Sequence, residues 1–185
     1  MLNWHPEDPD MYEDVQTRYN YAHSNLHLSQ EQRLKKMWRS SRDSARTPVQ
    51  WDDSENAGFT TGKPWFYVNP NYTQINAAAQ EKDPDSLLNF YRKAIALRKA
   101  LPVVRHGTYK EYFSADPKRY VYSRQMPGQK LLVICSFSEK NEKMRVPKGF
   151  DLSKAKLVAQ THSIISDTLM PYESRVYLWE DQQGV

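Results

Sequence analysis

The clearest pattern of apolar positions runs from Leu87 to Leu101, where a spacing of three and four residues predicts an amphipathic helix. Asp83–Ser86 precedes this pattern, and an acidic residue followed by proline is typical of a first helical turn. Pro102 ends the pattern, because proline cannot continue a helix. We therefore expect a helix over about residues 85–100.

After Pro102 the apolar positions alternate with a period of two, which predicts β-strands. The expected strands are Gly107–Phe113, Arg119–Arg124, Lys130–Phe137, Lys143–Val146, Lys156–Gln160 and Ser174–Trp179. Proline and glycine turns separate them, and short strands at this spacing are typical of an antiparallel sandwich. Leu131–Cys135 is apolar on both faces, so it should form the central strand, with Cys135 as an inert core residue.

The first 82 residues have weaker periodicity. We expect a long loop over 1–28 with one helical turn near Tyr12–Tyr19, then a helix that begins at Ser29 with Gln32 in the capping-box position. Residues 43–82 are rich in proline, glycine and aromatic side chains, and an irregular segment this long is usually functional or packed on something. This region has too few regular elements to bury its own aromatic residues, so it either wraps the sandwich or belongs to something larger.

Composition narrows the class of protein. The 185 residues are 39% hydrophobic and 26% charged, which is a folding composition. Acidic residues interrupt the basic ones despite a net charge of +4, which argues against nucleic-acid binding, and no apolar run reaches the roughly 18 residues of a membrane span. The single Cys135 excludes an intramolecular disulfide. With no signal peptide at the start, we expect a cytoplasmic protein. A complete (β/α)8 barrel needs about 200–250 residues, more than this chain has.

Local motifs for chemistry are weak. Gly58–Lys63 imitates a phosphate loop, but only three residues separate its glycines and Pro64 follows the lysine. His23 and His27 have the spacing of helical metal ligands, without a third ligand. The pair Asp52-Asp53 lies in a hydrophilic turn, where such residues are common. These residues alone assign no catalytic group, no metal site and no cofactor.

A longer motif is distinctive. Arg42–Asp53 contains the run Ala-Arg-Thr-Pro-Val-Gln-Trp-Asp, and Asn56–Trp65 and Val68–Asn76 continue it. Together these segments closely resemble the C-terminal third of the oligo-1,6-glucosidase and α-glucosidase branch of the α-amylase family, glycoside hydrolase family 13. The resemblance covers essentially the whole chain, and the opening Met1–Trp4 is similar to the stretch that follows the eighth barrel strand. Val49 departs from the pattern, because methionine is commoner there.

The resemblance implies an α+β fragment of such an enzyme. Residues 1–103 would be the C-terminal end of the catalytic (β/α)8 barrel, with the loops after strand eight and the last helix, and 104–185 would be the family's antiparallel β-sandwich. The nucleophile, acid/base and stabilising carboxylates of the family lie on earlier barrel strands, so the chain would begin after all three. A retaining mechanism needs nucleophile and acid/base together, so we expect this chain alone to be inactive.

One site residue carries over from the resemblance. Arg46 matches the arginine at the deep wall of the family's sugar pocket, where it pairs with a barrel aspartate, so Arg46 is the expected substrate-binding residue. The other interpretation is a structural ion pair that tethers its loop, and we favour that role for Arg42. Trp51 and Trp65 are expected to pack rather than to bind sugar. The implied partners are an α-linked glucoside, reached through the parent enzyme, and the barrel portion itself.

Two other functions stay open. An autonomous carbohydrate-binding module would need exposed aromatic residues on one face of the sandwich; the candidates are Tyr109, Tyr112, Tyr120, Tyr122 and Tyr177. A non-catalytic scaffold subunit is the other possibility, although glucosidase-like transporter partners carry a membrane anchor that this sequence lacks. Whatever the function, we expect residues 1–80 to expose apolar surface and to favour self-association.

Overall fold

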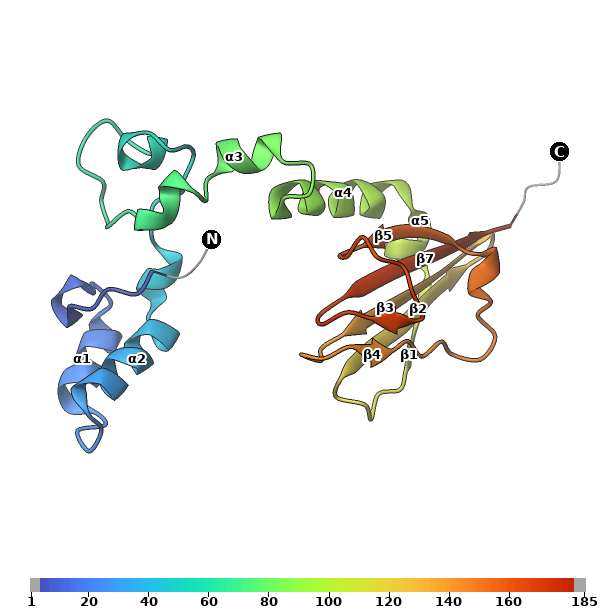
Figure 1. The fold of residues 1–185 in the computed structure, drawn as a ribbon, viewed down its shortest axis with the longest axis horizontal. Coiled ribbons are helices and arrows are strands. Elements are labelled where there is room, and N and C mark those ends of the chain that lie inside the picture. The colour runs from blue at the N-terminus through green and yellow to red at the C-terminus, as the bar shows by residue number, and fades with distance from the viewer. Residues whose placement is uncertain (1–3, 182–185) are drawn as a thin grey trace. The chain divides into compact units, whose positions relative to one another are not determined.

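The computed structural model describes residues 4–181, and the chain divides into two compact units, residues 4–91 and 92–181 of the described part. The first unit is helical and rich in loops (Figure 1). Its helices are α1 (Val15–His23), α2 (Gln30–Ser40) and α3 (Ala77–Lys82), joined by short 3-10 helices at Pro9–Met11, Arg42–Ala45, Glu55–Gly58 and Pro70–Thr73. The irregular character expected for residues 43–82 is confirmed, except that α3 was not predicted.

Side-chain caps explain where α1 and α2 begin. The Asp14 carboxylate accepts the Thr17 N–H, so α1 begins at Val15, later than the helical turn expected near Tyr12. The predicted capping box is confirmed at α2, where the Ser29 hydroxyl accepts the Gln32 N–H at 3.2 Å. The Gln32 side chain in turn accepts the Ser29 N–H at 3.0 Å.

Helix α4 (Leu87–Ala100) is the long helix predicted from the apolar pattern, and α5 (Pro102–His106) follows it with Pro102 in its first turn. The expected start at residue 85 is two residues early. The Ser86 hydroxyl accepts the Asn89 N–H at 3.2 Å, whereas the Asp83 carboxylate accepts the Asp85 N–H in the turn before the helix. The division between the two units lies within α4.

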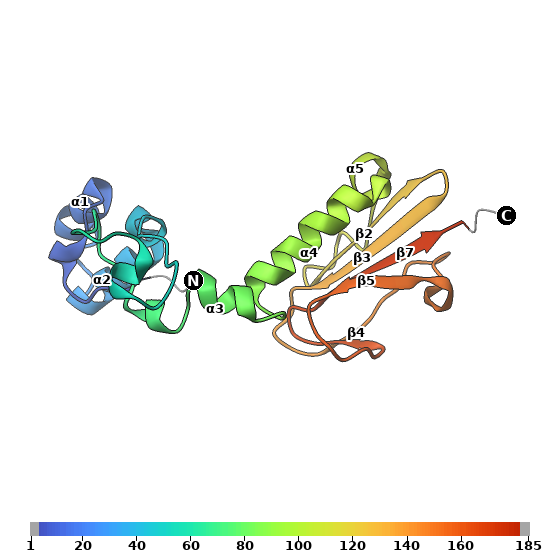
Figure 2. The ribbon, with the colours of Figure 1, turned by 90° about the horizontal axis from the view of Figure 1, so that it is seen from above.

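The second unit holds an antiparallel sheet of five strands in the order β1-β2-β3-β7-β5, with β3 in the centre as predicted. Its strands are β1 (Thr108–Tyr112), β2 (Arg119–Met126), β3 (Gln129–Ser136), β5 (Lys156–Gln160) and β7 (Ser174–Glu180). A separate two-stranded sheet pairs β4 (Glu142–Lys143) with β6 (Thr168–Leu169) (Figure 2). The strand expected over Lys143–Val146 is therefore wrong beyond Lys143, and β6 was not predicted.

The central strand β3 supplies both cores of the second unit, because successive side chains of a strand point to opposite faces. Leu132 and Ile134 pack on one face with Leu169 of β6. Leu131 and Val133 pack on the other face with Val103 of α5. The small sheet and α5 thus cover opposite faces of the large sheet, as Figure 2 also shows.

The five tyrosines considered as a sugar-binding face do not share one face. Tyr177 is buried and Tyr112 is partly buried in the core beneath β6. Tyr109 and Tyr120 are exposed on the other face, and both rings contact Tyr122.

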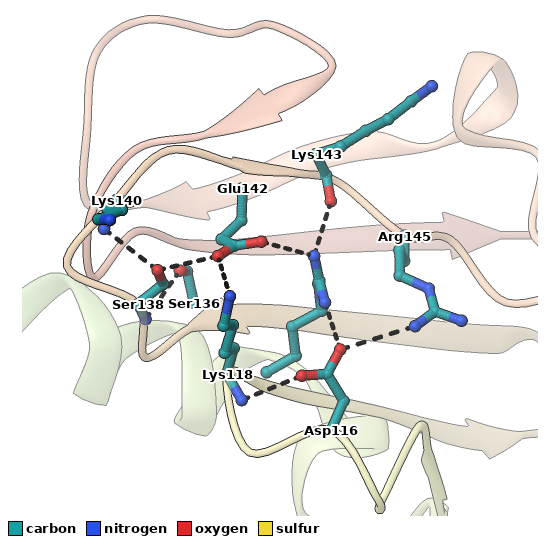
Figure 3. A network of polar contacts seen from close by, with 9 residues as sticks. Asp116, Lys118, Ser136, Ser138, Lys140, Glu142, Lys143 and Arg145 are labelled. Carbon is teal, nitrogen blue, oxygen red and sulfur yellow. Dashed lines mark hydrogen bonds and ion pairs between the residues drawn. The ribbon is translucent and has the colours of Figure 1, made fainter.

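A network of polar contacts attaches β4 to the turn between β1 and β2 (Figure 3). Arg119, only 9% exposed in its side chain, donates to Asp116 and, at 3.0 Å, to Glu142. Lys118 also pairs with Glu142, at 3.2 Å, and Arg145 pairs with Asp116. The network places β4 although this strand has only two residues.

Neither a membrane-spanning helix nor a metal-binding cluster is found among the described residues. Among residues 4–181, every helix is too short or too polar to cross a membrane. The same part of the chain contains no group of three or more His, Cys, Asp or Glu side chains arranged to hold a metal ion. Cys135 lies on β3, and burial raises the pKa of its thiol, as an inert core position predicts.

Candidate functional site

The arginine expected to bind substrate, Arg46, lies at the end of a short 3-10 helix, Arg42–Ala45. The Ser41 hydroxyl accepts the Asp43 N–H at 3.2 Å and caps the start of this helix. The Arg46 N–H donates to the Asp43 carbonyl at 2.9 Å and closes its end. Because a 3-10 helix has three residues per turn, the side chains of Asp43 and Arg46 lie on the same side.

Asp43 is completely buried, and one of its two carboxylate oxygens is tightly held. Oδ2 accepts the backbone N–H groups of Glu13 and Asp14, both at 2.8 Å. These residues lie 30 and 29 positions earlier in the sequence, immediately before α1. The buried carboxylate therefore joins the 3-10 helix to the start of α1.

The second oxygen, Oδ1, faces Arg46. The distance from Arg46 Nη1 to Asp43 Oδ1 is 3.5 Å, and Oδ1 has no hydrogen bond within the described residues. The Arg46 side chain is 43% exposed, so the contact with Asp43 is an ion pair between a buried anion and a half-exposed cation. In residues 4–181 the guanidinium of Arg46 has no other polar partner, which leaves most of its donors available to a ligand.

Tyr12 lies beside this ion pair. Burial, and secondarily the negative charge of Asp43, raise the pKa of Tyr12 to about 12. Its hydroxyl is buried and has no hydrogen-bond partner among the described residues. The surroundings of Asp43 thus contain two buried polar atoms, Tyr12 Oη and Asp43 Oδ1, that could still accept a partner.

Arg42 forms the structural ion pair expected for it. Its Nε and Nη2 donate to the same oxygen of Asp14, at 2.9 and 2.6 Å. The Asp14 carboxylate also accepts the Thr17 hydroxyl, and this bond, with Arg42 in a smaller role, outweighs burial and lowers the pKa of Asp14. Asp14 is a well-satisfied cap of α1, so Arg42 contacts the fold rather than a vacant site.

The motif residues after Arg46 hold two loops together. The Gln50 side chain is buried and donates to Asn71 Oδ1 at 2.8 Å and to the Ile75 carbonyl at 2.7 Å. The backbone carbonyl of Gln50 accepts the N–H of Ala77, the first residue of α3. This role of Gln50 was not predicted from the sequence, where the only signal was the Asn and Gln residues among aromatic ones.

A cavity of about 410 Å³ lies in the first unit, between Glu13 and the loop that follows the Arg46 motif. Its walls are Glu13, Asn56, Lys63, Pro64, Trp65, Phe66, Tyr67 and Val68. Trp65 is 62% exposed and Trp51 is 54% exposed, and the Trp65 ring contacts that of Phe66 with 5.4 Å between the centroids. The packing role expected for the two tryptophans stays a prediction. Glu13, a wall of this cavity, also donates one of the two backbone hydrogen bonds that the Asp43 carboxylate accepts.

The other candidates from the sequence fold locally. Asp52 Oδ1 accepts the N–H and the hydroxyl of Ser54, and these bonds lower the pKa of Asp52. Gly58 has a φ of +64°, and a side chain there would meet the Asp52 carboxylate at 2.6 Å. The Gly58–Lys63 segment thus begins against Asp52, and its Thr60 and Gly62 carbonyls accept from the Asn56 amide at 3.3 and 3.2 Å. His23 Nδ1 lies 3.2 Å from the Tyr19 carbonyl, and neither His23 nor His27 belongs to a cluster of possible metal ligands within residues 4–181.

Carboxylates are sparse at the cavities that the described residues form. The walls of three such cavities hold at most one carboxylate each. Where the pKa of an Asp or Glu side chain departs from its ordinary value in residues 4–181, it is lowered. A general acid needs the opposite shift.

Comparison with known proteins gives consistent matches. Residues 11–107 match the family model described as the alpha-amylase catalytic domain. The oligo-1,6-glucosidase of Parageobacillus thermoglucosidasius is 38% identical over 174 residues, which are 90% of this chain and 31% of that protein. The chain therefore spans about a third of the length of the curated relatives it matches.

Solved structures agree. The trehalose-6-phosphate hydrolase of Bacillus licheniformis aligns with a TM-score of 0.90 at 33% identity, over 98% of this chain and 34% of that one. The isomaltulose synthase of Klebsiella sp. LX3 aligns with a TM-score of 0.85 at 32% identity, over 96% of this chain and 33% of that one. These proteins have different named activities but share this portion of their structure.

Proposed function

The chain belongs to the α-amylase family, glycoside hydrolase family 13, and from this premise we propose that it is the C-terminal part of a retaining α-glucosidase of the oligo-1,6-glucosidase kind. The observation that carries the proposal is the continuous match over nine-tenths of this chain to about a third of such enzymes. In the parent enzyme, residues 1–103 would complete the barrel and 104–185 would form the supporting β-sandwich. The substrates would be short α-linked glucosides.

Exposed apolar side chains support a larger partner. Leu87, Tyr91 and Ile95 are spaced four residues apart on α4, so they share one face of the helix, and each is more than half exposed. A helix face of this kind normally packs against protein. The partner in our proposal is the remaining part of the barrel, and self-association would be the consequence where that part is missing.

Within this proposal Arg46 is the substrate-binding residue. Its guanidinium is half exposed, and a planar guanidinium can hold a carboxylate while it donates to sugar hydroxyl groups. We assign no catalytic residue to this chain, because a retaining mechanism needs two facing carboxylates and our proposal places both in the remaining part of the parent enzyme.

The experiment has two arms. The purified 185-residue chain is assayed on a chromogenic α-glucoside, alone and after co-expression with the N-terminal two-thirds of the P. thermoglucosidasius enzyme. We expect no turnover from the chain alone and turnover from the pair, with Arg46→Ala in the pair as the binding-deficient control. Turnover by the chain alone, abolished by a substitution within it, would refute the proposal.

An autonomous carbohydrate-binding function is the second candidate, and one observation favours it. Tyr109 and Tyr120 are exposed, their hydroxyl groups lie 3.2 Å apart, and Glu111 accepts from Tyr109 at 3.0 Å. Aromatic faces bordered by polar groups can bind the C–H face and the hydroxyl groups of a sugar. Calorimetric titration with maltose and isomaltose separates the two functions: binding that Tyr109→Ala and Tyr120→Ala abolish supports the module, and binding lost with Arg46→Ala supports the fragment.

A further inference from the structure

The buried carboxylate of Asp43 contacts both the start of α1 and the guanidinium of Arg46. We propose that Asp43 is a positioning residue for Arg46: it is fixed to the start of α1 through one oxygen and orients the guanidinium for substrate through the other. This inference rests on the proposed function, because it concerns the same arginine. It extends that function by identifying what holds the arginine in place.

The first step is the attachment of Asp43. Oδ2 accepts two backbone N–H groups at 2.8 Å, from Glu13 and Asp14. Hydrogen bonds to a charged acceptor are stronger than neutral ones, and two of them fix the plane of the carboxylate. Because Asp43 is 0% exposed, water does not compete for these bonds. The carboxylate is therefore an immobile part of the first unit.

The second step concerns the other oxygen. Oδ1 is buried and has no hydrogen bond in the described part of the chain, although a buried anionic oxygen without a partner is costly. Arg46 Nη1, at 3.5 Å, supplies the charge that compensates it. This attraction holds one edge of the guanidinium against Asp43. The remaining donors of Arg46 then face away from Asp43, where a sugar could reach them.

The third step compares the ion pair of Arg46 with that of Arg42, which lies four residues earlier in the sequence. Arg42 donates twice to Asp14 at 2.9 and 2.6 Å, the geometry of a closed structural pair. Arg46 meets its carboxylate at a longer distance and without a hydrogen bond. The looser contact restrains Arg46 without using up its donors.

Asp43→Asn separates attachment from orientation. The asparagine oxygen can still accept the Glu13 and Asp14 N–H groups, but its amide nitrogen then faces Arg46, and two donors repel each other. Asp14→Asn is the matched control, because it alters a neighbouring buried carboxylate that contacts Arg42 instead of Arg46. Both variants are compared with the original chain.

The first readout is the rate at which phenylglyoxal modifies each arginine, followed by peptide mass mapping of the intact 185-residue chain. We expect Asp43→Asn to raise the rate at Arg46 severalfold and to leave Arg42 unchanged, while Asp14→Asn does the reverse. Hydrogen exchange at the Glu13 and Asp14 amides checks that the attachment persists. An unchanged rate at Arg46 with those amides still protected would overturn the inference.

The second readout is activity of the pair formed with the N-terminal two-thirds of the P. thermoglucosidasius enzyme. Asp43→Asn should lower kcat/KM about tenfold, the effect of losing one interaction with a charged group. If the unaltered pair is inactive, the proposed function fails while the modification rates still decide the role of Asp43. If Asp43→Asn does not fold, NMR of the original chain decides, since free rotation of the Arg46 guanidinium contradicts the inference.

Discussion

The two units of this chain each bury a carboxylate completely, Asp43 in the first and Glu173 in the second, and the two are used differently. Glu173 Oε1 accepts Arg175 Nε at 2.6 Å, and Oε2 accepts the Met170 N–H at 2.7 Å. Arg175 is equally buried and donates to the carbonyls of Ser166 and Thr168 at 2.5 and 3.0 Å. Both oxygens of Glu173 and all three side-chain nitrogens of Arg175 have hydrogen-bond partners. We call such a fully partnered ion pair closed.

Asp43 is the open counterpart. One of its oxygens is satisfied twice by backbone groups, and the other has only the distant charge of Arg46, a side chain that is 43% exposed. A closed buried pair leaves no donor for a ligand, whereas an open one keeps a cation at the surface with donors to spare. Glu173 and Arg175 thus use their charges within the fold, whereas Arg46 keeps the free donors that its proposed substrate-binding role requires.

The largest effect is expected from Glu173→Ala. Removing the carboxylate leaves the Arg175 guanidinium buried and uncompensated, which should lower the free energy of unfolding of the second unit by about 3–5 kcal/mol. Urea denaturation followed by circular dichroism measures it. Glu180→Ala, at the exposed last residue of β7, is the control and should change the value by less than about 0.5 kcal/mol. Equal effects of the two substitutions would remove the distinction between a closed pair and a surface acid.

Asp43→Ala should have a smaller effect, confined to the first unit. Two backbone N–H groups lose their acceptor, but Arg46 can turn to solvent, so we expect a loss of about 2–3 kcal/mol. Hydrogen exchange at Glu13 and Asp14 should accelerate. The comparison breaks if Asp43→Ala costs as much as Glu173→Ala, since an open pair should tolerate the loss better.

Most of the fold could be predicted from local patterns. The capping box of Ser29 and Gln32 depends on residues three apart, and the sheet follows from alternation along each strand. Strand β6 is different, because two residues carry no periodicity and its partner strand β4 lies much earlier in the chain; the Thr168 carbonyl also accepts a bond from Arg175. The start of α4 was misplaced because Asp83 and Ser86 both suit a cap, and only the observed bond to Asn89 distinguishes them.

The candidate site was less predictable. Arg46 came from resemblance to a family motif, since a lone arginine in a loop has no pattern of its own. Its partner Asp43 could not be inferred, because the bonds that bury it come from Glu13 and Asp14, about 30 residues away. No sequence pattern predicts that these two segments are in contact. The assignment of Arg46 to substrate binding stays a prediction.

The pH dependence of stability separates the closed pair from ordinary acids. Burial alone would raise the pKa of Glu173, but the bonds from Arg175 and Met170 outweigh it and lower the pKa below its ordinary value of 4.5. The resulting stability is complete above that value and is lost as the pH falls through the lower folded-state pKa. Unfolding midpoints of the original chain should therefore fall more steeply in acid than those of Glu173→Gln. Parallel curves for the two proteins would contradict the linkage.

The smallest effect is expected from Lys118→Ala in the network of Figure 3. The Lys118 side chain is 60% exposed, and its partner Glu142 keeps bonds from Arg119 and Ser138 when the lysine is removed. Exposed ion pairs contribute little because water screens them, so the free energy of unfolding should fall by no more than about 0.2–1 kcal/mol. Added salt should reduce even this difference, because it screens exposed charges further. If the loss matched that of Glu173→Ala, the number of partners in an ion-pair network, rather than its burial, would set its contribution to the free energy of unfolding of this unit.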